Sequence, residues 1–402
     1  MDFSGKTVVL GVTGGIAAYK ACDLVSRLRK KDIKLHVIMT KHACEFVQPL
    51  TFEVLSGARA VTDQFNRDFP WEVEHIALAK AADVFAVVPA TANILGKYAH
   101  GIADDMLSTT LLATRAPVLF APAMNTAMYE NPAVQDNIAA LKARGCRFVK
   151  PVSGHLACGD TGRGKLADVE TIEQAILDAL TQKDMAGMHV TVTAGPTREA
   201  LDPVRFLSNH STGKMGYAIA RSARMRGADV TLISGPVALP PVDGVHMVPV
   251  TSACDMRQAV MDQLPQSDFV IKAAAVGDYR PAECKTDKIK KHDDDMSVSL
   301  VRNPDILAEI GSKRRDDQVI CGFSMETKDL LENSAKKLKN KNCDVIVANN
   351  LKVEGAGFAG DTNVVTLLYR DGTAEPLALM GKSEVADILL DRLLALHQRK
   401  RS

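Results

Sequence analysis

The sequence has few of the features that would assign it to a specialised class of protein. One tryptophan and 5% aromatic residues occur among 402, and 49 Lys and Arg residues almost balance 48 Asp and Glu residues, for a net charge of +1. This balance gives no reason to expect a nucleic-acid or membrane partner. No apolar run is long enough to span a bilayer, and the first residues lack the pattern of a signal peptide. There is no repeat of solenoid length and no low-complexity tract.

The eight cysteines are scattered, with no Cys-x-x-Cys and no Cys/His spacing typical of a metal site. We therefore expect reduced, mostly structural thiols and a cytoplasmic protein. The hydrophobic share of 46% and the charged share of 24% are ordinary for globular proteins. A length of 402 residues predicts two or three domains.

Strands and helices are predicted to alternate through the first half of the chain. Apolar, β-branched runs predict strands at 6–12, 35–40, 82–91, 117–122 and 147–150, with helices at 17–30, 46–55 and 166–180. This alternation predicts a doubly wound α/β sheet, whose ligands lie beyond the carboxyl ends of the strands. The pair Gly14-Gly15 lies at such an end. A dinucleotide fingerprint needs a third spaced glycine and a later acid, so a mononucleotide fits better.

A second strand, loop and helix start near the middle of the chain. Residues 190–193 predict a short buried strand, and residues 213–216, Gly-Lys-Met-Gly, begin a helix. Amide groups and the dipole at a helix start favour phosphates. The loop between them adds further donors: Arg198, Arg205, Asn209 and Lys214. We expect an anion-binding loop, with an ordinary surface loop as the alternative, and domains of 1–187 and 188–402.

The rest of the second half again predicts an α/β fold, with strands at 229–235, 245–250, 268–275, 344–350 and 364–369. Residues 285–292 form a lysine-rich stretch, which is either a solvated surface or an arm that closes over phosphates. Lys337 and Lys341 are four residues apart on a predicted helix, so both can face one anion.

Several motifs together resemble a known family. Gly-Gly-Ile-Ala-Ala-Tyr-Lys at 14–20, Pro-Ala-Met-Asn-Thr-Ala-Met at 122–128, Ala-Cys-Gly-Asp at 157–160 and the isolated His75 resemble those of flavin-dependent cysteine decarboxylases. Over nearly its whole length, the chain resembles the bacterial bifunctional phosphopantothenoylcysteine decarboxylase/phosphopantothenate–cysteine ligases of coenzyme A biosynthesis. The resemblance implies two Rossmann-like domains, an N-terminal flavodoxin-like HFCD flavoprotein domain and a C-terminal nucleotide-binding ligase domain.

For the first domain, the resemblance implies that FMN oxidises the substrate thiol, which lets CO2 leave, and then reduces the product. His75 is then the active-site histidine, Asn125 binds the substrate carboxylate beside Met124, and Cys158 on a flap gives the final proton. From the sequence alone, His75 can also start a helix and Asn125 can shape a turn. The expected FMN-binding residues are Gly14, Gly15, Ile16, Ala17, Thr40, Pro89, Ala90, Thr91, Asn93 and Ser108.

For the second domain, the resemblance implies that CTP and Mg²⁺ activate 4′-phosphopantothenate as an acyl-cytidylate, which the amine of L-cysteine then attacks. Asn209 and Arg205 bind the phosphopantothenate, and Lys288 stabilises the transferring phosphate. The expected CTP-binding residues are Asp278, Lys288, Pro304, Asp305, Ile306, Leu307, Phe323, Lys337 and Lys341. The ligands of Mg²⁺ are not predicted. A homo-oligomer is expected, with trimeric first domains and dimeric second domains that together make a dodecamer.

Two positions depart from the family pattern. Lys165 stands where relatives usually have Arg, which is the better bidentate clamp, and Gly277 stands where they usually have Ser or Ala. Two other functions remain open at this stage. One is a flavin or nicotinamide oxidoreductase with a regulatory nucleotide-binding domain. The other is a non-enzymatic flavoprotein subunit, against which the presence of His75 and Cys158 counts.

Overall fold

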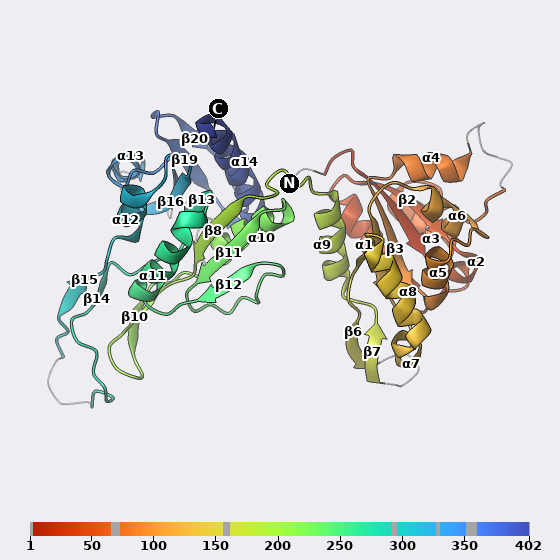
Figure 1. Cartoon of the computed structure of the whole chain (residues 1–402), viewed down its shortest axis with the longest axis horizontal. Coiled ribbons are helices and arrows are strands. Elements are labelled where there is room, and N and C mark those ends of the chain that lie inside the picture. Colours follow the sequence, from red (N-terminus) through yellow and green to blue (C-terminus); the bar gives the residue numbers. More distant parts are fainter. Residues whose placement is uncertain are drawn as a thin grey trace. The chain divides into compact units, whose positions relative to one another are not determined.

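The computed structural model describes residues 3–65, 73–155, 161–290, 296–326, 330–350 and 360–401, so Cys158 lies outside the described residues. The chain divides into two compact units, Asp2–Thr181 and Gln182–Ser402 (Figure 1). The division falls slightly before the boundary expected near 187, because the intervening residues pack with the second unit. Met185 is fully buried there and donates its N–H to the carbonyl of Arg226 at 3.0 Å. The Arg226 guanidinium in turn binds both carboxylate oxygens of Asp184, at 2.8 and 2.6 Å.

The first unit is built on a five-stranded parallel sheet in the order β2-β1-β3-β4-β5. Its strands, with the hairpin β6-β7, are β1 (Thr7–Val12), β2 (Lys34–Met39), β3 (Val84–Ala90), β4 (Val118–Pro122), β5 (Arg147–Phe148), β6 (Val152–His155) and β7 (Thr161–Lys165). Its helices are α1 (Ala18–Arg29), α2 (Lys41–Cys44), α3 (Pro49–Ser56), α4 (Glu74–Ala81), α5 (Ala92–Ala99), α6 (Met106–Ala113), α7 (Thr126–Glu130), α8 (Pro132–Ala143) and α9 (Val169–Leu180). This strand order is that of flavodoxin-like sheets, so the predicted fold class is confirmed.

Helices cover both faces of this sheet (Figure 1). Every residue of β1 and β3 is buried, as their near-continuous apolar sequences require in a parallel sheet. On one face, Val9, Phe85 and Val87 pack with residues of α4, α5, α6 and α8. The helix predicted at 46–55 begins later than expected, at Pro49 of α3, because proline has no N–H and suits the first helical position.

The second unit contains an eight-stranded sheet in the order β12-β11-β8-β13-β16-β17-β19-β20. These strands are β8 (His189–Ala194), β11 (Asp229–Ser234), β12 (His246–Pro249), β13 (Phe269–Lys272), β16 (Val319–Glu326), β17 (Val345–Asn350), β19 (Val365–Tyr369) and β20 (Ala374–Pro376). Three small pairs are β9 (Arg198–Ala200) with β10 (Phe206–Ser208), β14 (Tyr279–Pro281) with β15 (Leu300–Arg302), and β18 (Thr362–Asn363) with β21 (Met380–Gly381). The helices are α10 (Lys214–Met225), α11 (Ala253–Gln263), the short 3₁₀ helix η1 (Leu264–Gln266), α12 (Ile306–Lys313), α13 (Leu330–Asn340) and α14 (Lys382–Arg401).

The first six strands of that order are parallel and follow the Rossmann pattern 3-2-1-4-5-6, whereas β19 and β20 extend the sheet in antiparallel fashion. On one face the sheet packs against α10 and α14, and on the other against α11, α12 and α13. Both units therefore have a point where the strand order reverses, between β1 and β3 in the first and between β8 and β13 in the second.

Candidate active sites

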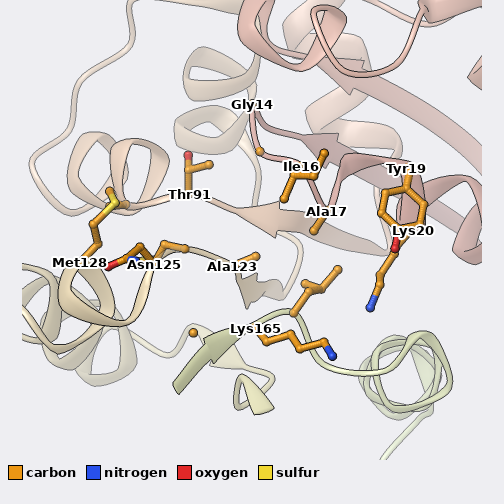
Figure 2. A pocket seen from close by; sticks show the side chains of 15 residues that line it. Gly14, Ile16, Ala17, Tyr19, Lys20, Thr91, Ala123, Asn125, Met128 and Lys165 are labelled. Atoms are coloured by element: carbon orange, nitrogen blue, oxygen red, sulfur yellow. The ribbon is translucent and has the colours of Figure 1, made fainter. Parts of the chain in front are cut away.

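A cavity of about 540 Å³ lies at the carboxyl ends of β1, β3 and β4. It includes the point where the strand order of the first sheet reverses, which is where doubly wound sheets bind their ligands. Four segments contribute to its lining, with residues 14–17, 19–20, 91–92, 123–125, 128 and 164–166. In Figure 2, Asn125 and Met128 lie at one end of the cavity and Tyr19 and Lys20 at the other. Its volume and mostly apolar lining suit a small flat cofactor together with part of a substrate.

The two glycines of the first turn have different surroundings. A Cβ on Gly14 would lie 2.3 Å from the Cβ of His42, so packing requires glycine there. A Cβ on Gly15 would meet nothing closer than the Cγ2 of Thr91, at 3.8 Å. Because Gly15 and Thr91 both line the cavity, the missing side chain of Gly15 leaves space for a bound group. This cradle fits the expected flavin.

Thr13 holds the two strand ends together. Its hydroxyl donates to the carbonyl of Pro89 at 2.7 Å and accepts the N–H of Thr91 at 3.1 Å. The side chain is buried, so both bonds are shielded from water. Thr13 thereby fixes the backbone of Thr91 at the wall of the cavity.

Asn125 and the hairpin β6-β7 form the opposite wall. The Asn125 Oδ1 accepts the N–H of Ala127 at 2.8 Å and so caps α7. Next to it, the N–H of Met124 donates to the carbonyl of Gly164 at 2.9 Å. Gly164 has φ of +130°, and a Cβ there would lie 2.4 Å from the carbonyl oxygen of Met124, so this contact requires glycine. Lys165 follows it and also lines the cavity.

The structure brings only part of the predicted first site into this cavity. Seven predicted residues line it: Gly14, Gly15, Ile16, Ala17, Thr91, Met124 and Asn125. Six described ones do not: Thr40 caps α2, Pro89 and Ala90 are buried in β3, Asn93 is exposed on α5, Ser108 is buried in the capping box of α6, and His75 is partly buried in the first turn of α4. Lys20 was not predicted as a site residue, although it ends the motif at 14–20 and also lines the cavity.

A second cavity, of about 550 Å³, lies at the carboxyl ends of β8, β13 and β16. It includes the reversal point of the second sheet, between β8 and β13. Residues 209–216, 272–276 and 323–325 line it, together with Asp278, Lys337, Asn349, Asn363 and Lys382. The second unit therefore repeats the arrangement of the first, with a different chemical lining.

The start of α10 faces this cavity. Its N-cap, Gly213, has φ of +79°, and a Cβ there would lie 2.9 Å from the Val237 Cγ1, so both backbone and space require glycine. No side chain caps the N-terminus of α10. Since Gly213–Gly216 line the cavity, the positive end of the α10 dipole faces the space in which an anion would bind.

Four lysines and one carboxylate line the same cavity: Lys214, Lys272, Lys337, Lys382 and Asp278. Burial, together with the positive charge of Lys337, lowers the pKa of Lys272 to about 8, against opposing contributions from Asp305 and Asp278. Burial also lowers the pKa of Lys382, whose ammonium donates to the carbonyl of Gly360 at 2.6 Å. Desolvated ammonium groups gathered around one cavity favour a highly charged anion such as a polyphosphate.

Five predicted residues of the second half line this cavity, Asn209, Lys214, Asp278, Phe323 and Lys337, whereas Arg198 of the predicted anion-binding loop does not. The Asn209 amide donates to the carbonyl of Ala275 at 3.1 Å. The predicted turn at 304–307 starts α12: Ile306 and Leu307 enter the core, and Asp305 caps the helix by accepting the N–H of Ala308 at 3.0 Å. The remaining predicted residues that do not line the cavity are Pro304, Asp305, Lys341, Arg205 and Lys288.

Lys272 and Lys382 are cavity residues that the sequence analysis did not select. Lys272 ends an otherwise apolar strand, and that pattern was a usable signal. Lys382 begins the last helix, far along the chain from the other lining residues, so no local pattern points to it. Gly277, where relatives usually have a larger residue, has room for one, because a Cβ would meet nothing closer than 3.5 Å.

The described parts of the chain offer neither a metal cluster nor a membrane-spanning helix. They contain no group of three or more His, Cys, Asp or Glu side chains that could hold a metal ion. Among these same residues, no helix combines the length and apolar character needed to cross a bilayer. The seven cysteines described are all free thiols.

Comparison with known proteins extends these observations. The family model described as Flavoprotein matches residues 2–181, and that of the DNA/pantothenate metabolism flavoprotein C-terminal domain matches residues 185–396. Over 400 residues the chain is 48% identical to the Coenzyme A biosynthesis bifunctional protein CoaBC of Bacillus subtilis, with 98% of each chain covered. It is 41% identical to the protein of that name from Haemophilus influenzae, with 99% of this chain and 100% of the other covered. A solved C-terminal domain of a CoaBC protein is 40% identical and matches with a TM-score of 0.47, covering 54% of this chain and all of that one.

Proposed function

Because the chain belongs to the family of coenzyme A biosynthesis bifunctional proteins, we propose that its two units catalyse consecutive reactions. The second unit joins 4′-phosphopantothenate to L-cysteine at the expense of CTP, and the first decarboxylates the resulting 4′-phosphopantothenoylcysteine to 4′-phosphopantetheine. The observation that carries this proposal is the pair of cavities at the two reversal points, one mostly apolar and one lined by lysines. The protein is expected to act in the cytoplasm. It is also expected to form a homo-oligomer of trimeric first domains and dimeric second domains, and mass photometry can test the number of chains in that particle.

In the first unit, Gly14, Gly15, Ile16, Ala17 and Thr91 are proposed to hold FMN. When bound, FMN supplies the oxidation of the substrate thiol that makes loss of CO2 possible, and it returns the electrons afterwards. The side chain of Asn125 holds the substrate carboxylate through a neutral amide. A positively charged group would stabilise the carboxylate in the ground state and so raise the barrier to the loss of CO2. Cys158 delivers the last proton to the product, since a thiol of ordinary pKa, about 8.5, is mostly protonated at neutral pH.

In the second unit, the N-terminus of α10 and the surrounding lysines are proposed to bind the triphosphate of CTP. Asp278 is the carboxylate lining this cavity, and it can hold a Mg²⁺ ion that arrives with the nucleotide. Asn209 orients the phosphopantothenate carboxylate for attack on the α-phosphate of CTP, which releases pyrophosphate, and Lys288 stabilises the phosphate that is transferred. Cysteine then displaces CMP by attack of its amine on the activated acyl group.

The test supplies the purified protein with 4′-phosphopantothenate, L-cysteine, CTP and Mg²⁺. The proposal predicts CMP, pyrophosphate, CO2 and 4′-phosphopantetheine. An oxidoreductase with a regulatory nucleotide-binding domain would release no CMP. Flavin identity is read by mass spectrometry after mild acid release, where the proposal predicts FMN.

Two variants separate the steps. Cys158→Ser should leave CMP release intact and stop the decarboxylase after CO2 loss, so a normal yield of 4′-phosphopantetheine would refute the role of Cys158. Lys288→Gln should leave only a small residual rate of CMP release and still decarboxylate supplied 4′-phosphopantothenoylcysteine. CMP release at the unmodified rate would refute the role of Lys288.

A further inference from the structure

Asp202, in the loop between β9 and β10, is a buried carboxylate with five hydrogen bonds. The residue is 2% exposed. Its Oδ1 accepts the backbone N–H groups of Val204 and Arg205, both at 2.8 Å, which closes its own loop. Its Oδ2 accepts the Nε and Nη2 of Arg205 at 3.0 and 2.6 Å. A carboxylate is buried only at a cost unless donors compensate its charge, and here the loop supplies them.

The fifth bond reaches a distant segment of the chain. The N–H of Ile289 donates to the Asp202 Oδ2 at 3.1 Å, and the carbonyl of Ile289 accepts from the Arg205 Nη2 at 2.8 Å. Asp202 and Arg205 thus hold both main-chain groups of one residue. Four residues earlier, the N–H of Lys285 donates to the carbonyl of Leu201 at 3.0 Å. The stretch from 285 to 289 is therefore fixed at both ends by the same loop.

Lys288 lies inside this fixed stretch, directly before Ile289. Its side chain is exposed, whereas Ile289 is partly buried. An exposed lysine on an unrestrained segment would sample many positions, and ordering it during the reaction would cost entropy. Holding the backbone beside it removes part of that cost before the substrate binds.

We propose that Asp202 is a positioning residue of the nucleotide-dependent reaction, which fixes the main chain at Ile289 and thereby presents Lys288. This inference rests on the proposed function of the second unit. Asp202 is not expected to contact the substrate, because both of its carboxylate oxygens already accept hydrogen bonds from the Arg205 guanidinium and from three backbone N–H groups. The negative charge of Asp202 contributes as well as its shape. An asparagine would either direct its NH2 group, which is a donor, at the Arg205 guanidinium or leave the positive charge of Arg205 without a counter-charge.

The main test compares Asp202→Asn with Asp287→Asn, which removes one exposed carboxylate from the same segment. For Asp202→Asn we expect the kcat of CMP release to fall by about 10- to 100-fold, with the KM for CTP unchanged within about twofold. Decarboxylation of supplied 4′-phosphopantothenoylcysteine by the first unit should be unchanged, and the unchanged KM for CTP shows that the second unit remains folded. Asp287→Asn should behave as the unmodified protein. A normal kcat for Asp202→Asn, or a loss seen only in KM, would overturn the proposal.

A double variant distinguishes positioning from general damage. If Asp202 acts through Lys288, Asp202→Asn should cause no further loss of residual activity in a Lys288→Gln background. A further loss of the same size as in the unmodified protein would mean that Asp202 acts by another route and would reject the proposal.

Hydrogen exchange provides a readout that needs neither activity nor a folded variant. In the unmodified protein, the amide of Ile289 should exchange at least about tenfold more slowly than those of Lys288 and Lys290. Equal exchange at the three amides would show that the clamp does not form. If Ile289 is protected and the unmodified protein releases no CMP, the proposed function fails and the clamp stands.

Discussion

Lys341 and Asp305 form an ion pair, with 2.5 Å between Nζ and Oδ2, that joins the end of α13 to the N-cap of α12. Both residues were predicted to bind nucleotide, and in the structure they bind each other. The Lys341 ammonium contributes most to the lowered pKa of Asp305 by hydrogen bonding, although burial opposes it. A nucleotide contact by Lys341 must therefore share or replace this pair.

Lys341→Met tests that exchange. The pair is partly exposed, so its loss should cost no more than about 1 kcal/mol and lower the Tm by less than about 4 °C. If Lys341 also contacts CTP, the KM for CTP should rise roughly tenfold, as loss of one charge-assisted hydrogen bond predicts. Lys336→Met, which breaks the exposed pair with Glu332 on the same helix, is the control. Equal KM values for CTP in the two variants would show that Lys341 does not contact the nucleotide.

Lys272 predicts a pH dependence of CTP binding. With a pKa of about 8, its ammonium is charged at pH 7 and loses its proton as the pH rises through 8. Ordinary lysines remain charged there. CTP affinity, measured by calorimetry, should fall roughly tenfold between pH 7 and pH 9, and Lys272→Met should bind weakly with a flat profile. An equally steep fall in the variant would exclude Lys272 as the cause.

The same lysine predicts a change of stability. Between pH 8 and the ordinary value of 10.5, the unfolded chain binds more protons at Lys272 than the folded chain does. The contribution of Lys272 to the free energy of unfolding should therefore rise with pH across this window. Denaturant unfolding of the unmodified protein and of Lys272→Met at pH 7.5 and 10 isolates this contribution as the difference between the two. The free energy of unfolding of the unmodified protein minus that of Lys272→Met should be larger at pH 10 than at pH 7.5. A smaller value at pH 10 would contradict the lowered pKa of Lys272.

Gly14 and Gly15 should respond differently to alanine. Gly14→Ala forces a Cβ against His42 and should lower stability by about 1–3 kcal/mol, read as a lower Tm. Gly15→Ala meets no close atom, so the Tm of the flavin-free protein should be unchanged, but its methyl group occupies the proposed flavin space. Visible flavin absorbance per protein should therefore fall in Gly15→Ala. Full flavin content in this variant would mean that the cofactor does not approach Gly15.

Asn125→Asp separates fold from chemistry. Aspartate keeps the oxygen that caps α7, so the fold should survive. The added charge opposes the substrate carboxylate, and decarboxylation should slow about 100-fold or more. Asn131 caps α8 in the same way, with 3.0 Å to the N–H of Ala133, and does not line the cavity, so Asn131→Asp is the matched control. Comparable rates in the two aspartate variants would contradict the role of Asn125.

The fold followed from local sequence signals. Apolar β-branched runs in β1 and β3 predicted buried parallel strands, and glycines marked the turns that follow β1 and β8. Ser108 was predicted to bind FMN, but in the structure it forms the capping box of α6 with Asp105, which accounts for its buried position.

The sites could be predicted only in part, because a cavity gathers residues by topology. Asn209 follows β10 of a small strand pair and Asp278 lies between β13 and β14, and only the fold brings both to one cavity. Lys382 reaches that cavity from the last helix, and no spacing in the sequence reveals this. Asp202 looked like an ordinary loop aspartate, since its partner at Ile289 is 87 residues away.

Arg226 has a practical consequence for dividing the protein. Its guanidinium is held between Asp184 and Asp391, with 2.7 Å to the latter, and Met185 is fully buried beside it. A ligase fragment that begins at residue 188 would lack Asp184 and Met185. The Arg226 guanidinium would then keep only Asp391 as a partner, and the core residues that Met185 covers would be exposed to water. Cleavage ahead of Gln182 spares both, so crystallisation trials or inhibitor screens on the separated ligase should begin there.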